Sequence, residues 1–318
     1  MPSNRPKVYI DGHVGTTGLR IRDWLAGRDD LELLHLPEAL RKDSSARRER
    51  VEEADVAVLC LPDDAARDAA AWAATGGTRI VDASTAHRVA RDWTYGLPEL
   101  DAEQRAAVRA AERVSNPGCY PSGFLLLVRP LVDAGLVAPD APLAVHALSG
   151  YSGGGRALIE RWESSETGLG SLPFEAPYAL DRLHKHIPEM VHYAGLAREP
   201  QFVPAVGPFR CGMRVQVPIP AGLLASDGDR IREALADRYA GEAFVRVAPG
   251  TGATAGETAL DPRGCNDTNR MDLHVHAHPS GHVLLVAILD NLGKGASGAA
   301  IQNLNLMLDL GEGTGLPG

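Results

Sequence analysis

The first third of the chain alternates short apolar runs with helix-like segments. Strands are predicted at residues 7–11, 31–36, 55–61 and 79–83, with helices between them at residues 19–26 and 63–75. The run at residues 55–61 is almost continuously apolar, which is typical of a parallel strand buried on both faces. This repeated strand–helix order predicts a parallel sheet with right-handed crossovers.

The pattern changes after Gly123. Strand-like runs follow at residues 144–148, 201–220 and 243–248, and the runs at 273–277 and 282–289 flank Pro279-Ser280-Gly281, which indicates a hairpin. This part is predicted to be an α+β domain with a mostly antiparallel sheet.

Two further segments have a helical pattern. Residues 296–310 are predicted to form a helix that is apolar on one face, through Ile301, Leu304 and Leu308. The charge-dense segment 41–53 is expected to be a solvated helix face rather than a partner site.

Length and charge narrow the possible functions. The 318 residues suit about two domains. With 32 Lys and Arg against 41 Asp and Glu, the net charge of −9 argues against a nucleic-acid partner but leaves an anionic substrate possible. The four cysteines, Cys60, Cys119, Cys211 and Cys265, are far apart in the sequence and form no CxxC pair. We therefore expect a reducing compartment and no structural zinc site. Residues 1–7 lack the apolar core of a signal peptide and no apolar run reaches transmembrane length, which predicts a cytoplasmic protein with no membrane partner.

A glycine-rich motif, GxxGxxG, follows the first predicted strand and opens the first helix. Glycines in this position let the backbone approach a pyrophosphate, which then lies at the helix N-terminus. The motif predicts a dinucleotide site, with a plain tight turn as the alternative; its candidate residues are Gly12, Gly15, Thr16, Thr17 and Gly18.

The residues alone leave open which dinucleotide would bind. Glu38 stands where a carboxylate would bind the ribose of NAD, whereas Arg41 and Lys42 could hold the 2′-phosphate of NADP. All three could equally be solvated loop charges. Ser84 follows the fourth strand, at the sheet edge where ligands bind, and is a candidate cofactor contact or a helix cap.

A single cysteine follows a Pro-Gly turn and precedes the apolar run at residues 124–128. Pro121 is tolerated in the first turn of a helix, so Cys119 is expected at a helix N-terminus. Unpaired N–H groups and the helix dipole favour an anion there, and the thiolate is the reactive form of cysteine. Cys119 is therefore a candidate nucleophile, although a buried cysteine in a turn is the commoner role.

Residues 149–156, with the sequence SGYSGGGR, form a loop before a predicted helix. Its backbone N–H groups could bind an anion, with Arg156 adding charge, or the loop could be a hinge. Ser149 and Gly150 are accordingly candidate substrate contacts. Arg156 and Arg210 are each either a partner for a carboxylate or a surface charge.

Two groups of histidines have notable spacing. His184 and His186 precede Glu189, and a thiolate nucleophile needs a nearby proton donor, for which histidine is the usual choice. Residues two apart share a face on a strand but not on a helix. A zinc site is a poor interpretation without a third ligand. The alternating histidines at 274, 276 and 278 are expected on an exposed strand face, with a metal site as the minor alternative.

Five segments in order, spanning nearly the whole chain, resemble one family, the shorter form of N-acetyl-γ-glutamyl-phosphate reductase. They are residues 11–18, 115–121, 149–153, 184–189 and 290–298, and the segment around Cys119 and the Asn291-Leu-Gly-Lys-Gly-Ala296 segment are the most specific. Gly293 and Tyr151 depart from the family pattern without touching the nucleophile motif.

The resemblance implies a fold class and a domain division. It implies an α/β chain with a Rossmann-type NADP-binding domain at residues 1–118, completed by the C-terminal helix at 297–318. Residues 119–296 would form an α+β catalytic and oligomerisation domain of the semialdehyde dehydrogenase type. The enzyme would be a homo-oligomer, a dimer or a tetramer.

The resemblance also implies roles for individual residues. Cys119 would be the nucleophile and one of the paired histidines the acid/base; His186 is preferred and His184 is retained. The glycine loop would bind NADP together with Asn291, Lys294, Gly295 and Ala296, and Asn116 and Glu189 would contact the substrate.

The implied reaction is the NADPH-dependent reduction of N-acetyl-γ-glutamyl phosphate through a cysteine thioester. The nearest alternative is a related reductase that acts on aspartyl phosphate or carrier-linked aminoadipyl phosphate. A non-catalytic NADP-binding protein on the same fold is a further alternative, which the intact cysteine and histidines disfavour.

Overall fold

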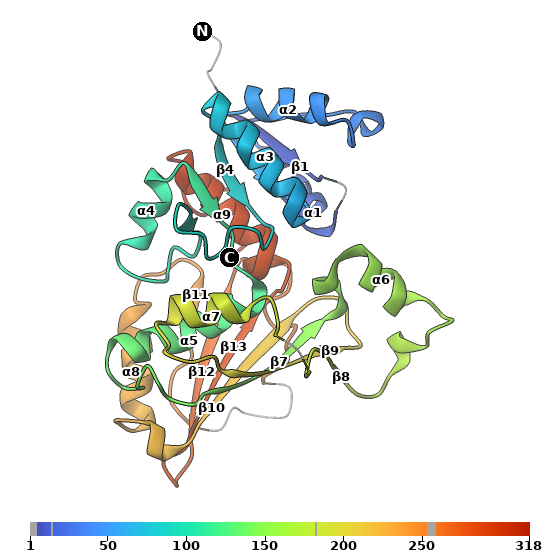
Figure 1. The fold of residues 1–318 in the computed structure, drawn as a ribbon. Helices are drawn as coiled ribbons and strands as arrows, with labels where there is room; N and C mark the ends of the chain where they lie inside the picture. The colour runs from blue at the N-terminus through green and yellow to red at the C-terminus, as the bar shows by residue number, and fades with distance from the viewer. Residues whose placement is uncertain (1–4, 14, 182, 253–258) are drawn as a thin grey trace. The chain divides into compact units, whose positions relative to one another are not determined.

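Two units make up the chain in the computed structural model, which describes residues 5–13, 15–181, 183–252 and 259–318. Unit 1 comprises Met1–Pro117 and Ala296–Leu316, and unit 2 comprises Gly118–Gly295 and Pro317–Gly318. Figure 1 traces the elements of both units along the chain.

Unit 1 is built on a parallel sheet of six strands in the order β2-β1-β3-β4-β6-β5. Its elements are β1 (Lys7–Asp11), α1 (Thr16–Leu25), β2 (Glu32–Leu34), η1 (Glu38–Leu40), α2 (Ser44–Glu53), β3 (Val56–Leu59), α3 (Asp63–Gly76), β4 (Arg79–Asp82), β5 (Thr94–Tyr95), α4 (Gln104–Ala110), β6 (Arg113–Ser115) and α9 (Gly298–Met307). The predicted parallel sheet is confirmed. The helix expected from residue 19 begins at Thr16, so the second half of the glycine motif is already helical.

Apolar side chains cover both faces of this sheet. On one face, Val8 and Val56 pack in a core with residues of α1, α4 and α9. On the other face, Tyr9 and Ala57 pack with residues of α2 and α3. Because β1 pairs with β2 on one side and with β3 on the other, the order in which strands are added to the sheet reverses at β1. Ligands of doubly wound sheets bind at the carboxyl ends of the strands at such a point.

The predicted C-terminal helix is confirmed as α9, and its apolar face lies in the core of unit 1 through Ile301, Leu304 and Leu308. Every residue of α9 is buried, including its polar ones. Gln302 donates a hydrogen bond to Glu99, and Asn303 donates to the carbonyl of Gly96 and to the side-chain oxygen of Asn116. A helix buried on all sides needs partners for its polar side chains, and unit 1 supplies them from its own loops.

Unit 2 contains a mixed sheet of seven strands in the order β11-β12-β13-β10-β7-β9-β8, of which four neighbouring pairs are antiparallel and two are parallel. Its elements are α5 (Cys119–Asp133), β7 (Ala144–Gly150), α6 (Gly155–Glu163), β8 (Ala176–Pro177), α7 (Ile187–Ala194), β9 (Gln201–Gly207), β10 (Met213–Ile219), α8 (Gly228–Arg238), β11 (Val245–Val247), β12 (Met271–Ala277) and β13 (Val283–Leu289). The predicted α+β organisation and the hairpin of β12 and β13 are confirmed.

Helix α5 fixes the geometry of unit 2. It packs against β10 and β13 and contacts α7 and α8 (Figure 1). At Gly123 an added Cβ would lie 2.9 Å from Cγ2 of Val215, closer than real Cβ atoms approach, so the helix lies directly on the sheet. The position of the first residue of α5 is therefore set by close packing along the helix.

Candidate active site

Cys119 is the first residue of α5, as the sequence predicts. The preceding residue, Gly118, is the N-cap and supplies no side-chain cap, and the side chain of Cys119 is half-buried. The first N–H groups of a helix have no partner within the helix, and together with the helix dipole they favour a thiolate. The start of α5 therefore provides the partial positive charge that favours a thiolate at this position.

Two neighbours hold the backbone at Cys119. The N–H of Gly118 donates a 2.9 Å hydrogen bond to the buried carboxylate of Glu189, in the first turn of α7. A Cβ added at Gly295 would lie only 2.8 Å from Cβ of Cys119. Glu189 therefore supports the turn that carries the cysteine, and Gly295 packs directly against it.

The paired histidines lie in the turn before α7, so neither the strand nor the helix considered for them applies. His186 is the N-cap of α7 and is buried, whereas His184 lies in the loop before it. The backbone N–H of His186 donates to Nδ1 of His184 at 3.1 Å, and the two ring centroids are 4.8 Å apart. The turn, rather than a shared strand face, brings the two imidazoles together.

Aromatic rings from three further places in the sequence surround the histidines. The ring of Tyr120 lies 5.9 Å from that of His184 and 5.7 Å from that of His186, and the Phe202 ring lies 5.2 Å from that of His184. The hydroxyl of Tyr178 lies 3.4 Å from Nε2 of His184 and donates to the Tyr120 hydroxyl at 3.3 Å. These residues form a mostly apolar surround for the imidazoles.

This environment raises the pKa of both tyrosines. Burial raises the pKa of Tyr120 well above its usual value, and burial raises the pKa of Tyr178 to about 12. The negative charge of an ionised Cys119 raises the pKa of each tyrosine further. The sulfur of Cys119 is thus close enough to both hydroxyls for electrostatic coupling, and both phenols keep their protons at neutral pH.

Sequence reasoning singled out neither Tyr178 nor Phe202 and gave no role to Tyr120. Tyr120 stands inside the cysteine motif, so its position beside Cys119 was an available signal. Tyr178 and Phe202 lie about 60 to 80 residues away in the chain, and no spacing rule connects them with Cys119. Only the folded sheet, in which β8 pairs with β9, brings them together.

The predicted substrate residues have different environments. Ser149 is buried and its hydroxyl donates to the carbonyl of Gly150, and hydrogen bonding with Ser149 lowers the pKa of Tyr120 against the larger effect of burial. At Gly150 an added Cβ would lie 2.5 Å from the carbonyl oxygen of Arg210, so this glycine is required by close backbone packing. Both lie at the end of β7.

Each of the two candidate arginines forms an ion pair at the surface. Arg156 is largely exposed on α6 and pairs with Glu160 at 2.7 Å, and Arg210 pairs with Glu163 at 3.0 Å. Asn116 belongs to unit 1, where it is buried and its amide donates to the carbonyl of Ala296. These three side chains already have protein partners.

The segment around Asn291 is also engaged. Its side-chain oxygen accepts from the N–H of Gly212 at 2.8 Å, and its amide donates to the hydroxyl of Ser152 at 2.9 Å. Asn291 therefore holds together the end of β13, the chain before β10 and the loop after β7. Lys294 is fully buried, with Nζ over the ring of Phe244 at 5.9 Å.

Gly12 and Gly18 of the predicted dinucleotide motif are required by close backbone packing. Gly12 has φ +86°, and an added Cβ there would lie 2.2 Å from the carbonyl oxygen of Cys60, at the end of β3. At Gly18 a Cβ would lie 2.5 Å from the carbonyl oxygen of Gly12. Gly15, the N-cap of α1, supplies no side-chain cap to the first N–H groups of the helix, which are the groups that bind anions at helix N-termini.

Alanine at Gly18 and at Gly15 should separate folding from cofactor binding. A methyl group at Gly18 has no space and should destabilise unit 1 by roughly 1–3 kcal/mol. At Gly15, where φ is −77° and the nearest atom would be 3.4 Å away, alanine fits, so we expect near-native stability but weaker cofactor binding. Thermal unfolding and a fluorescence titration with NADPH measure the two effects. Unchanged affinity in Gly15→Ala would contradict the assignment of this loop.

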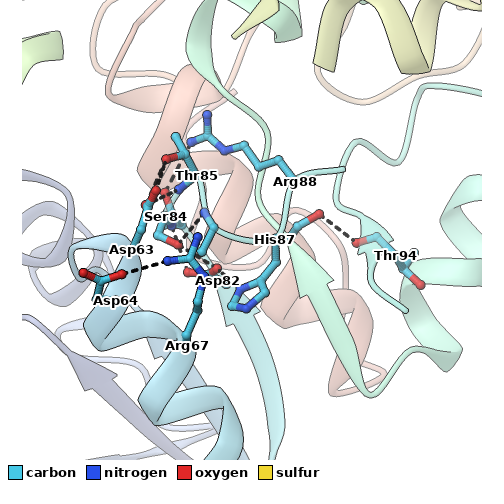
Figure 2. Close-up of polar contacts among 12 residues, drawn as sticks. Asp63, Asp64, Arg67, Asp82, Ser84, Thr85, His87, Arg88 and Thr94 are labelled. Atoms are coloured by element: carbon cyan, nitrogen blue, oxygen red, sulfur yellow. Dashed lines mark hydrogen bonds and ion pairs between the residues drawn. The ribbon is translucent and has the colours of Figure 1, made fainter. Parts of the chain in front are cut away.

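Ser84 belongs to a buried polar cluster at the end of β4. Its hydroxyl donates to Asp82 at 2.8 Å, and Nδ1 of His87 lies 2.6 Å from the same carboxylate. The imidazole of His87 stacks on Trp93 at 4.0 Å. Thr85 bonds in turn to Asp63 (Figure 2). Ser84 thus holds its own loop at the carboxyl edge of the sheet, and it caps no helix, because the residues that follow it form turns.

The charges considered for cofactor selection are on the surface. Glu38 and Arg41 lie in and directly after η1, 3.6 Å apart, and Lys42 is exposed beside them. The solvated helix expected at residues 41–53 is observed as the mostly exposed α2; the exception is Arg47, which forms a bidentate ion pair with the buried Asp11.

Of the alternating histidines, His274 and His276 lie half-buried on β12, with their rings nearly parallel and 6.2 Å apart, and His278 is exposed directly after the strand. Burial lowers the pKa of His274. Among the described residues, no group of three or more His, Cys, Asp or Glu side chains is arranged to hold a metal ion. Nor does any described helix have the length and apolarity needed to cross a membrane.

Comparison with known families identifies both units. The semialdehyde dehydrogenase NAD-binding domain matches residues 35–108, and the semialdehyde dehydrogenase dimerisation domain matches residues 119–291. N-acetyl-gamma-glutamyl-phosphate reductase 2 of Pseudomonas putida is 49% identical over 308 residues, covering 95% of this chain and 97% of the relative. The enzyme of the same name from Nostoc sp. is 46% identical, covering 98% of this chain and 100% of the relative. The chain belongs to the N-acetyl-gamma-glutamyl-phosphate reductase family.

Solved structures support the same fold for this reductase family member. A probable aspartate-semialdehyde dehydrogenase from Pseudomonas aeruginosa matches with a TM-score of 0.72 and 17% identity, covering 96% of this chain and 99% of the other. Aspartate semialdehyde dehydrogenase with NADP from Candida albicans matches with a TM-score of 0.62 and 15% identity over the same shares. At this identity the likeness concerns the fold alone.

Proposed function

We propose that the protein catalyses the NADPH-dependent reduction of N-acetyl-γ-glutamyl phosphate to N-acetylglutamate 5-semialdehyde and phosphate, a step of arginine biosynthesis. The observation that carries the proposal is the half-buried Cys119 at the N-terminus of α5, in the same unit as two imidazoles that share aromatic neighbours with it. The names of relatives at 46–49% identity supply the substrate.

The first step is nucleophilic substitution at Cys119. Its thiolate forms a bond to the γ-carbonyl carbon, and the bond from that carbon to the phosphate oxygen breaks, so phosphate leaves and a thioester remains. Covalent capture divides one difficult substitution into two easier ones. Backbone N–H groups in the first turn of α5 stabilise the negative charge that develops on the carbonyl oxygen.

The second step resolves the thioester. The glycine loop at Gly12, Gly15 and Gly18 would hold the nicotinamide dinucleotide, which supplies a hydride when bound. Once the thioester carbon is reduced, its oxygen carries the negative charge of a thiohemiacetal, and His186 is the group that gives and takes a proton at this oxygen. The carbon–sulfur bond then breaks, the aldehyde leaves, and Cys119 is again a thiolate.

The finer assignments are part of the same proposal. Arg41 and Lys42 after β2 support NADP rather than NAD, since cations there suit a 2′-phosphate. Residues 1–118 with 297–318 would form the NADP domain, and residues 119–296 the catalytic and oligomerisation domain of a cytoplasmic homo-oligomer. The cofactor would be bordered by Asn291, Lys294, Gly295 and Ala296. The substrate would be bordered by Ser149, Gly150, Glu189, Asn116 and Arg156, of which Asn116 and Arg156 already have protein partners.

A single assay tests the proposal. The purified protein should oxidise N-acetylglutamate 5-semialdehyde with NADP only when phosphate is present, because phosphate must attack the thioester to complete the reverse reaction. Aspartate semialdehyde is the matched control substrate, and NAD is the matched control cofactor. Faster turnover of the aspartate compound would contradict the substrate assignment, and turnover without phosphate would contradict the acyl-phosphate chemistry.

A further inference from the structure

The tautomer of His184 can be read from its neighbours. The backbone N–H of His186 donates to Nδ1 of His184 at 3.1 Å, and a backbone N–H can only donate. Nδ1 is therefore unprotonated, and the proton of the neutral imidazole is on Nε2. A second proton on Nδ1 would set one donor against another, so this contact keeps His184 neutral.

The proton on Nε2 of His184 faces a hydroxyl. The Tyr178 hydroxyl lies 3.4 Å from Nε2 and itself donates to the Tyr120 hydroxyl at 3.3 Å. A hydroxyl can accept one hydrogen bond while it donates another, so the three groups form one directed chain. Contacts of this length are common in active sites without substrate and shorten in the complex.

His184 and Tyr178 each have the proton that this hydrogen-bond chain needs. Burial raises the pKa of Tyr178 to about 12, so its hydroxyl keeps the proton that it donates to Tyr120. Of the two imidazoles, His184 is fixed as neutral, which leaves His186 to change its charge during turnover. The His184 ring lies edge-on to the His186 ring at 4.8 Å and restricts where that ring can lie.

We infer that Tyr178 is a positioning residue of this site, whose hydroxyl accepts a hydrogen bond from the Nε2–H of His184, fixes the orientation of that ring and thereby orients the His186 imidazole. This inference rests on the proposed function for its kinetic consequences but not for the tautomer itself. Tyr178 need not touch the reacting atoms, because it acts through His184. The Tyr120 hydroxyl completes the chain on the side of Cys119.

Tyr178→Phe tests the inference because it removes only the hydroxyl. We expect kcat to fall by roughly 10- to 100-fold, with KM for the semialdehyde and the melting temperature little changed, and the pH profile of kcat to shift. Tyr151→Phe is the matched control: its hydroxyl contacts Glu163 on α6, and kcat should remain at the wild-type value. An unchanged kcat and pH profile in Tyr178→Phe would overturn the inference.

A second variant separates positioning from general damage. Asparagine at position 184 can still accept from the N–H of His186 but lacks the donor that faces Tyr178. If both residues act through one hydrogen bond, Tyr178→Phe should add little to the loss caused by His184→Asn. Multiplicative losses in the double variant would contradict the inference.

Nitrogen-15 NMR of the histidine side chains gives a readout that needs no activity. Wild-type His184 should show a single Nε2–H tautomer around neutral pH. Tyr178→Phe should keep this tautomer, because the N–H of His186 still donates to Nδ1, but should shift the Nε2–H resonance through loss of the hydrogen bond to Tyr178. A Nδ1–H tautomer in the wild type would overturn the inference. If the wild type reduced no acyl phosphate yet showed the expected tautomer, the proposed function would fail while the hydrogen-bond chain would stand.

Discussion

Replacing Cys119 by serine is expected to lower phosphate-dependent turnover by roughly 10⁴-fold or more, while NADPH binding stays intact. A serine hydroxyl at the start of α5 has the same hydrogen-bonding environment but is not ionised near neutral pH, so it cannot attack the acyl phosphate at a useful rate. Steady-state kinetics with the semialdehyde, NADP and phosphate measure the loss, and a fluorescence titration measures NADPH affinity.

Cys60→Ser is the matched control for this substitution. Burial and the carboxylates of Asp82 and Asp11 raise the pKa of Cys60 to about 12, so its thiol stays protonated and has no nucleophilic role. Burial likewise raises the pKa of Cys265 to about 11. Iodoacetamide near neutral pH should therefore label Cys119 before these two. Near-normal turnover in Cys119→Ser would eliminate the thioester route.

The second large effect is expected at His186. Replacing it by alanine removes the proposed proton donor and should lower kcat by roughly 10²–10⁴-fold. The loss should also flatten the limb of the pH–rate profile that reports the imidazole, because the proposal assigns to His186 the proton exchange with the thiohemiacetal oxygen. Thioester formation, seen as a burst of phosphate release from the acyl phosphate, should be affected less than aldehyde formation.

Two further variants serve as comparisons for His186→Ala. His192→Ala removes an exposed imidazole from the last turn of the same helix and should leave kcat near the wild-type value. His184→Asn should have an intermediate effect, since His184 acts through His186. Equal and mild losses in the variants at positions 184 and 186 would count against both roles.

Several elements of the fold were predictable from residues that are adjacent in the sequence. The apolar run at β3, the alanine-rich helix α3 and the Pro-Ser-Gly turn between β12 and β13 each appear in the structure near their predicted positions. The start of α5 at Cys119 was also predictable, because the Pro-Gly turn, the tolerated Pro121 and the apolar run that follows lie next to one another in sequence.

The environments of some predicted helices could not be read from the sequence, because residues far away in the chain decide them. Segment 41–53 contains Arg47, whose partner Asp11 lies 36 residues earlier, so its burial cannot be read from charge density alone. The buried polar side chains of α9 likewise depend on Glu99, Gly96 and Asn116, 187 to 207 residues away.

The sequence by itself determined the parallel strand–helix order, the glycine loop and the cysteine at a helix start, because each depends on neighbours within a few residues. Only the tertiary structure decided what surrounds that cysteine: the carboxylate of Glu189 under its turn and the hydroxyl chain from Tyr178 to Tyr120. The physical reason is that backbone conformation is set largely by adjacent residues, whereas hydrogen bonds and burial are set by residues that meet only when the sheet of unit 2 has formed.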